Sequence, residues 1–193
     1  MSIFDLVFIV LCLAFAGTSI RVLYLALRGK RDGAIRTGRA LVQATAAYLA
    51  IVAVVGLVSP QRIVAIGADK CSDDWCIAVD SVTHGPDGAQ IRYIVSIRVS
   101  SRARRIVQRE HGVVVYLRDA AGQRFDPLPD PKAVPFDTLL HPGESIRAPR
   151  QFVVPVQATD LAMVVTREGV FPGCCIIGDE NSLLHKRTIV RVN

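Results

Sequence analysis

The stretch ALVQATAAYLAIVAVVGLV, residues 40–58, decides how the rest of the chain is organised. Its polar side chains are only Gln43, Thr45 and Tyr48, and Ser59-Pro60 ends the run. As a helix, its 19 residues would rise about 28 Å, close to the ~30 Å thickness of the hydrocarbon core of a bilayer. The pattern therefore predicts a membrane-spanning helix.

A second apolar run precedes it, from Ile3 to about Ile20. Three polar side chains interrupt this run: Asp5, Thr18 and Ser19. Its 18 residues reach the lower limit for a spanning helix, and the span is longer if the Arg21 side chain extends to the interface. The two runs together predict a two-helix transmembrane hairpin over residues 1–60.

A basic segment, residues 28–39, joins the two runs and is expected to be a loop. It holds one anion, Asp32, and five cations: Arg28, Lys30, Arg31, Arg36 and Arg39. Because Lys and Arg concentrate in cytoplasmic loops, we expect this loop in the cytoplasm. The protein would then be a two-pass protein of the plasma (inner) membrane, with its N-terminus and everything after Val58 extracytoplasmic.

The net charge of +6 is unevenly distributed. Residues 1–60 hold six Lys/Arg and two Asp/Glu, or +4, whereas residues 61–193 hold 17 and 15, or +2. Most of the excess therefore lies beside the apolar runs, where it indicates membrane orientation. We expect no nucleic-acid partner.

Two other interpretations of the apolar runs compete with the hairpin. Ala14-Phe15-Ala16 resembles a signal-peptide cleavage site, but the first residues lack the required cations, and cleavage would leave the basic loop outside. A buried hairpin of a soluble protein would need a large apolar partner surface, and the remaining chain is small and strand-like. Both interpretations are less favourable than a membrane hairpin.

From Gln61 onward the pattern changes to short runs rich in β-branched and aromatic residues. Turn sequences separate them, at residues 85–88, 119–122 and 141–144, and the proline-rich segment 126–131 is a rigid crossover. These features predict an all-β domain over residues 61–193, a β-sandwich of about seven strands. The runs cover residues 62–67, 75–82, 90–100, 112–118, 151–156, 161–166 and 187–192.

The order of motifs in this domain resembles that of a known family. Val115-Tyr-Leu-Arg-Asp and Gly122-Gln-Arg-Phe125 are followed by Leu139-Leu-His-Pro-Gly-Glu-Ser145, Phe152-Val-Val-Pro155 and Leu161-Ala-Met-Val-Val165. This is similar to the secreted telokin-like, immunoglobulin-fold domains of bacterial lipoproteins and membrane-anchored proteins. In those domains a Pro-Gly-Glu turn leads into a strand that ends in Phe-x-x-Pro. The resemblance covers about residues 61–193 and implies an immunoglobulin-like sandwich in the cell envelope without catalytic residues. The cysteines depart from the family pattern.

Four cysteines lie in the part expected to be exported: Cys71, Cys76, Cys174 and Cys175. An even number in an oxidising compartment predicts disulfides. Three connectivities are possible. The local Cys71–Cys76 pair is slightly favoured, pairings with Cys174 and Cys175 would close longer loops, and a Cys174–Cys175 bond would be strained. Cys12, the fifth cysteine, is interpreted as a thiol inside an apolar helix.

A metal-binding or thiol-redox site at Cys174 and Cys175 is the alternative to structural disulfides. Thiols suit copper(I) or zinc, and further ligands could come from His185, His84, His111 or His141. The usual metal-ligand spacings and the C-x-x-C redox motif are both missing. We therefore expect no metal and no cofactor.

One basic cluster stands out in the predicted sandwich: Arg102, Arg104, Arg105 and Arg109. The hypothesis is that it binds a partner, either an acidic protein surface or anionic lipid heads. Asp73-Asp74-Trp75 is interpreted as a polar turn before a core tryptophan, and Glu110-His111 lacks a nucleophile beside it. Without a recognisable catalytic motif, the protein is not expected to be an enzyme.

The sequence thus predicts a membrane-anchored extracytoplasmic interaction module. We expect it to be an accessory subunit that binds another membrane or envelope protein, and the sequence leaves a homo-oligomer open. Small residues in the second helix, which would let a neighbouring helix approach closely, support a membrane partner: Ala44, Ala46, Ala47, Ala50, Ala53 and Gly56.

Overall fold

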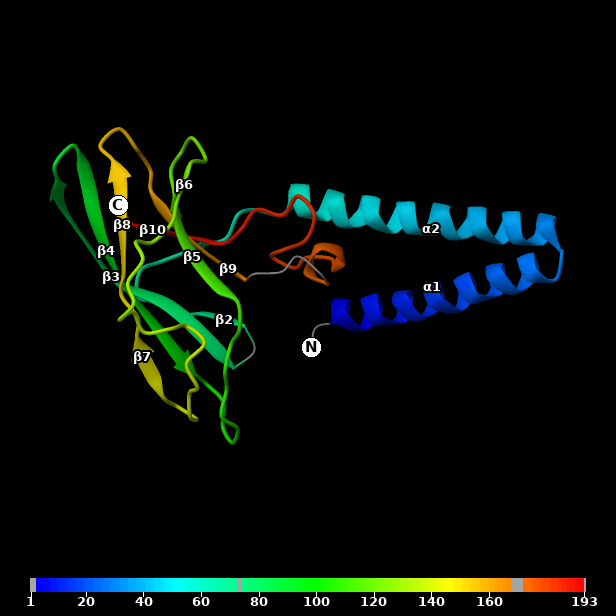
Figure 1. Ribbon diagram of the computed structural model, residues 1–193, viewed down its shortest axis with the longest axis horizontal. Coiled ribbons are helices and arrows are strands. Elements are labelled where there is room, and N and C mark those ends of the chain that lie inside the picture. The colour runs from blue at the N-terminus through cyan, green and yellow to red at the C-terminus, as the bar shows by residue number, and fades with distance from the viewer. Residues whose placement is uncertain (1–2, 73, 168–171, 193) are drawn as a thin grey trace. The chain divides into compact units, whose positions relative to one another are not determined.

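The computed structural model of the protein describes residues 3–72, 74–167 and 172–192 (Figure 1). These residues form two units. Those within 1–60 and 170–186 form a helical unit, and those within 61–169 and 187–193 form a sheet unit. Each unit therefore contains a segment from each end of the chain.

The helical unit is built on a hairpin of α1 (Ile3–Leu27) and α2 (Arg31–Val58) (Figure 1). Both helices are long and apolar enough to cross a membrane. Helix α1 ends at a turn in which Gly29 has a φ of 70°. Two backbone hydrogen bonds close this turn, from Gly29 N to Ala26 O and from Lys30 N to Leu25 O, both 3.0 Å long. This is the hydrogen-bond pattern of a glycine C-cap, and the predicted helical hairpin is confirmed.

The predicted basic loop over residues 28–39 is wrong in extent. Only residues 28–30 link the helices, because the helical conformation of α2 already begins at Arg31. Arg36 and Arg39 therefore lie in the first turns of α2. The 28 residues of α2 rise about 42 Å, more than the ~30 Å of a hydrocarbon core, so the helix is long enough to carry these cations beyond it.

The sheet unit is a β-sandwich of two five-stranded sheets. The first runs in the order β1 (Ile63–Val64), β10 (Ile189–Arg191), β9 (Ala162–Arg167), β5 (Val113–Arg118) and β6 (Arg124–Phe125). The second runs β2 (Lys70–Ser72), β3 (Trp75–Asp87), β4 (Gln90–Ser101) and β7 (Ser145–Arg147), and β8 (Arg150–Pro155) also pairs with β4. Neighbours are antiparallel except β1 and β10, which pair in parallel.

The core of the sandwich follows from alternation along its strands. In β4 the buried residues lie two apart, so one face of the strand points into the core; they are Tyr93, Val95, Ile97, Val99 and Ser101. Phe152 of β8, Leu117 of β5 and Met163 of β9 are fully buried in the same cluster. A sandwich after two N-terminal helices is therefore confirmed.

All seven predicted strand runs contain a strand, β1, β3, β4, β5, β8, β9 and β10. The structure adds β2, β6 and β7, so the prediction of about seven strands was too low for the described residues. Each added strand has two or three residues, too few for a sequence period. The predicted turns at 119–122 and 141–144 are confirmed, with Gly122 N bonded to Asp119 O and Glu144 N to His141 O, both 3.0 Å.

One segment departs from the predicted division of the chain into 1–60 and 61–193. Residues within 170–186 belong to the helical unit, although they connect β9 to β10 in sequence. We call its described part, residues 172–186, the return segment. It lies so close to α2 that a Cβ on Gly56 would overlap the carbonyl oxygen of Leu183, and Tyr48 donates a 2.6 Å hydrogen bond to the carbonyl oxygen of Cys175.

Candidate functional site

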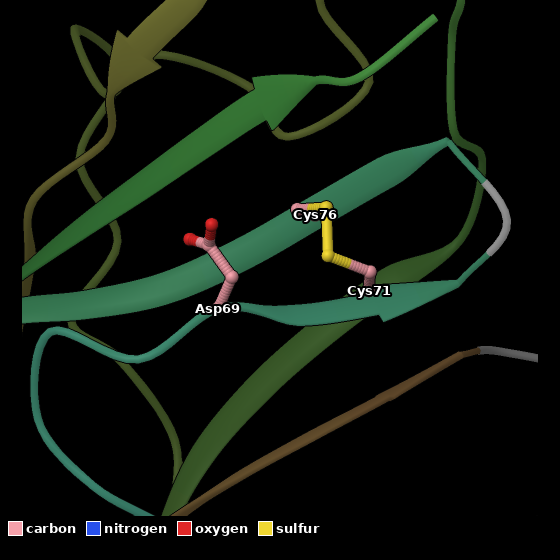
Figure 2. A group of neighbouring side chains, drawn as sticks. All are labelled: Asp69, Cys71 and Cys76. Atoms are coloured by element: carbon pink, nitrogen blue, oxygen red, sulfur yellow. A yellow bond between two sulfur atoms is a disulfide. The ribbon is translucent and has the colours of Figure 1, made fainter.

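The first candidate site is the cysteine pair at the start of the second sheet. Antiparallel pairing of β2 with β3 sets Cys71 opposite Cys76, and the two form a disulfide, which is the locally closed pairing that the sequence slightly favoured. Figure 2 shows the Asp69 side chain beside them. Among the described residues, Asp69, Cys71 and Cys76 form a group of three potential metal ligands, whose ligand atoms all lie within 4.8 Å of one another. Because both sulfurs are bonded to each other, neither is a thiolate ligand, and the group is structural.

The predicted basic cluster divides into two kinds of arginine. Arg102 forms a 2.8 Å ion pair with Asp69, and Arg109 forms a 2.8 Å ion pair with Asp137. The hydrogen bond from Arg109 lowers the pKa of the Asp137 carboxyl. These two arginines are therefore engaged within the sheet unit.

The other two arginines lie on an exposed loop after β4. Arg104 and Arg105 are exposed and have no ion-pair partner among the described residues. Two apolar side chains follow them, Ile106 at 63% exposure and Val107 at 42%. We call residues 104–107 the basic–apolar loop, and it offers cations and an apolar contact together.

Other polar residues singled out in the sequence have structural roles. Trp75 is buried in the core, as predicted, while Asp73 lies outside the described residues. Glu110 pairs with Arg167 at 3.0 Å, and His84 stacks on Tyr93 with ring centroids 5.3 Å apart. Trp75, Glu110 and His84 therefore each have a packing or ion-pair role within the sheet unit.

The second candidate site is in the return segment, where Cys174 and Cys175 lie on the short 3-10 helix η1 (Gly173–Cys175). Both are free thiols, so the prediction of disulfides at these two positions is wrong for this structure. Their Sγ atoms are 3.2 Å apart in hydrogen-bond contact. Adjacent cysteines can join only through a strained ring, which explains why the contact is a hydrogen bond between thiols.

The electrostatics of this pair favour the protonated form of Cys175. Its pKa is raised to about 11, first by the hydrogen bond with Cys174 and then by burial. The metal group that the sequence left as an alternative, the two cysteines with a histidine, does not assemble, because among the described residues no third His, Cys, Asp or Glu ligand atom lies within 4.8 Å of both thiols. His185 belongs to the same unit but is not within that distance.

A groove of about 500 Å³ lies between α1 and α2 in the helical unit. Cys12 and Phe15 line it from α1, Ala40 and Ala44 from α2, and Cys175 from the return segment. Its hydroxyl groups are satisfied within the chain. Three threonines donate to the carbonyl four residues earlier at 2.8–2.9 Å, and Tyr48 donates to Cys175; the threonines are Thr18, Thr37 and Thr45. The groove thus offers a largely apolar wall with two thiols, Cys12 and Cys175.

Sequence reasoning missed the placement of Cys12 and Tyr48. Both were interpreted as ordinary members of apolar helices, yet Tyr48 anchors the return segment and Cys12 shares the groove with Cys175. The hydrogen bond of Tyr48 spans 127 positions of sequence, and no local pattern could have indicated it.

No family model matches the chain. No curated protein matches its sequence. Solved structures similar to it include an uncharacterized β-sandwich protein from Clostridium difficile, 7% identical with a TM-score of 0.45 over 70% of this chain and 96% of that one. The yjhA protein from Bacillus subtilis is 14% identical, with a TM-score of 0.43 over 67% and 98%. A secreted protein from Mycobacterium tuberculosis is 12% identical, with a TM-score of 0.44 over 57% and 92%. Such similarity assigns no function.

Proposed function

We propose that this protein is a membrane-anchored extracytoplasmic interaction module, an accessory subunit that binds another membrane or envelope protein and catalyses no reaction. In this proposal α1 and α2 span the plasma membrane. The sandwich lies outside the cytoplasm and is immunoglobulin-like, in keeping with the telokin-like motif order. The observation that carries the proposal is the apolar surface that the hairpin leaves uncovered.

That surface extends around both helices. No described residue of α1 is buried, and side chains such as Ile3, Leu13 and Ile20 are 72%, 68% and 68% exposed. Exposed apolar area is unfavourable in water by about 25 cal/mol per Å². Apolar patches larger than a few hundred Å² indicate a membrane or a partner. Lipid around the hairpin removes this unfavourable exposure.

The charges of the hairpin support the proposed orientation. Five of its six cations gather at the turn, on residues 28–31 and the first turns of α2. The sixth, Arg21, lies within α1, and the other end of α1 carries Asp5. Cations at the turn favour a cytoplasmic turn. With two spans, both ends of the hairpin and the following sandwich are then extracytoplasmic.

We place the membrane partner in the groove between α1 and α2, as one of its transmembrane helices. Lipid is as apolar as the groove, so helix association in a bilayer depends on close packing rather than on the hydrophobic effect. The methyl side chains of Ala40 and Ala44 allow that approach along α2. The groove hydroxyls already have internal partners, so an apolar helix leaves none of them unsatisfied.

Filling the groove tests the proposal. Ala44→Leu adds bulk to the groove wall, whereas Ala46→Leu adds the same bulk to an exposed position of α2 outside the groove. In mild detergent we expect Ala44→Leu to reduce the amount of co-purifying membrane protein about tenfold, and Ala46→Leu to match the unmodified chain. Equal recovery from both variants would contradict docking in the groove.

A further inference from the structure

The thiol pair of the return segment is held by its backbone. Leu183 N donates to the Cys174 carbonyl oxygen at 3.2 Å, and the Tyr48 hydroxyl donates to the Cys175 carbonyl oxygen at 2.6 Å. Both carbonyls are thus occupied, and the two sulfur atoms remain as the ligating groups of this turn. The 3.2 Å between the Sγ atoms makes them a prearranged dithiol.

The return segment also contains buried polar atoms without a partner among the described residues. Ser182 is only 5% exposed, and its Oγ has no hydrogen-bond partner, nor has the buried Nδ1 of His185. A buried polar group left unpaired is unfavourable. Both atoms belong to the same segment as the dithiol.

The dithiol is suited to remain reduced in an oxidising compartment. A disulfide between adjacent residues is strained, and strained disulfides are readily reduced. Cys71 and Cys76, in contrast, are joined across a strand pair. The chain therefore separates a structural disulfide from a pair of thiols that is available as ligand.

We propose that Cys174 and Cys175 together bind one copper(I) ion. Two thiolates are soft ligands, which select copper(I) or zinc. A structural zinc site needs four ligands in a tetrahedron, and within the described residues no third ligand atom lies close to both sulfurs. The low ligand number therefore favours copper(I). This site goes beyond the partner-binding function proposed above, and the two share Cys175, which also lines the groove.

Binding of copper(I) requires the loss of two protons and a movement of the two sulfur atoms. Each thiol releases its proton to solvent, so two thiols and one Cu⁺ give one bis-thiolate complex of charge −1 and two protons, and no atom changes oxidation state. A copper(I) ion with two thiolate ligands is close to linear, so metal–sulfur bonds of ~2.3 Å place the sulfurs ~4.6 Å apart. The sulfurs now lie 3.2 Å apart, so side-chain rotation must separate them by about 1.4 Å.

The test is a copper(I) titration of the reduced, intact protein in detergent without oxygen, with the chromogenic chelator bicinchoninate as competitor. We expect one copper(I) per chain. Cys174→Ser and Cys175→Ser should each weaken binding about 100-fold, since each removes one of two ligands. Cys12→Ser removes the remaining described free thiol, which lines the same groove as Cys175, and so tests whether the pair alone holds the ion; we expect it to bind like the unmodified chain.

A second readout is the number of protons released, which a pH indicator measures in weakly buffered solution. We expect up to two protons per copper(I) near pH 8, because each thiol that binds as a thiolate releases its proton. Lack of copper(I) binding by the unmodified chain would overturn the proposal, as would full binding by both pair variants or tighter binding of zinc than of copper(I). Loss of binding in Cys12→Ser would overturn the assignment to the pair alone.

Discussion

At the scale of single residues, side chains that look alike in sequence differ in the partners they meet. Of four clustered arginines, Arg102 and Arg109 form ion pairs with Asp69 and Asp137, whereas Arg104 and Arg105 have no ion pair among the described residues. Each aspartate is far from its arginine in sequence, by 33 positions for Asp69 and 28 for Asp137. The sequence could therefore identify the cluster of arginines but not which of them form ion pairs. The same holds for the cysteines, of which one pair is a disulfide and the other a dithiol.

Removing the two unpaired arginines tests the basic–apolar loop. Arg104→Ala combined with Arg105→Ala should weaken co-purification of an extracytoplasmic partner several-fold and remove most of its dependence on salt concentration, because exposed charge contacts are screened by ions. Lys132→Ala changes an exposed cation elsewhere in the sheet unit and should have no effect. Partner recovery that is independent of salt in the unmodified chain would contradict a charged contact.

The raised pKa of Cys175 predicts how its alkylation depends on pH. The thiolate is the reactive form, so the rate with iodoacetamide should rise about tenfold per pH unit and level off only near the pKa of about 11. Cys174→Ser removes the thiol partner and should move the levelling point to lower pH. Mass spectrometry with fragmentation locates the modified residue. A plateau already near pH 9 in the unmodified chain would contradict the hydrogen-bonded thiol.

At the scale of elements, residue patterns predicted the regular structure well. Apolar runs gave both helices, and alternation in runs such as residues 90–100 gave seven of the strands. Residue patterns could not predict the position of the return segment, because its apolar residues follow neither a helical nor a strand periodicity. Tyr48, Val52 and Gly56 recur every four residues on one face of α2, where Val52 is fully buried and Gly56 lies against Leu183. In a helix that is apolar all round, that face has no distinguishing composition.

Glycine substitutions in α2 test this contact. Gly56→Ala would set a Cβ against the backbone of Leu183 and should displace the return segment, so that alkylation of Cys174 and Cys175 at constant pH becomes at least about tenfold faster. Gly38→Ala is the matched control, since a Cβ there meets nothing within 4 Å, and helix propensity predicts stabilisation by about 0.5–1 kcal/mol. Equal alkylation rates in the two variants would show that Gly56 does not position the segment.

At the scale of the whole molecule, the chain combines an apolar hairpin with a sandwich that has its own core. In the proposed function, the hairpin would anchor the protein through its uncovered apolar surface, and the cations at its turn would set the direction of insertion. The sandwich would then be exported, which agrees with its disulfide, because disulfides persist in oxidising compartments. The proposed partner binding and the proposed copper(I) binding both assume this orientation in the membrane.

The most direct test of the account is labelling of single cysteines in intact cells with a membrane-impermeant maleimide. In a background with Cys12, Cys174 and Cys175 replaced by Ser, one variant carries Lys30→Cys in the hairpin turn and another carries Ala121→Cys in the exposed turn between β5 and β6. The account predicts that Ala121→Cys is labelled in intact cells and Lys30→Cys only after the membrane is permeabilised. Labelling of Lys30→Cys in intact cells, with Ala121→Cys protected, would contradict it.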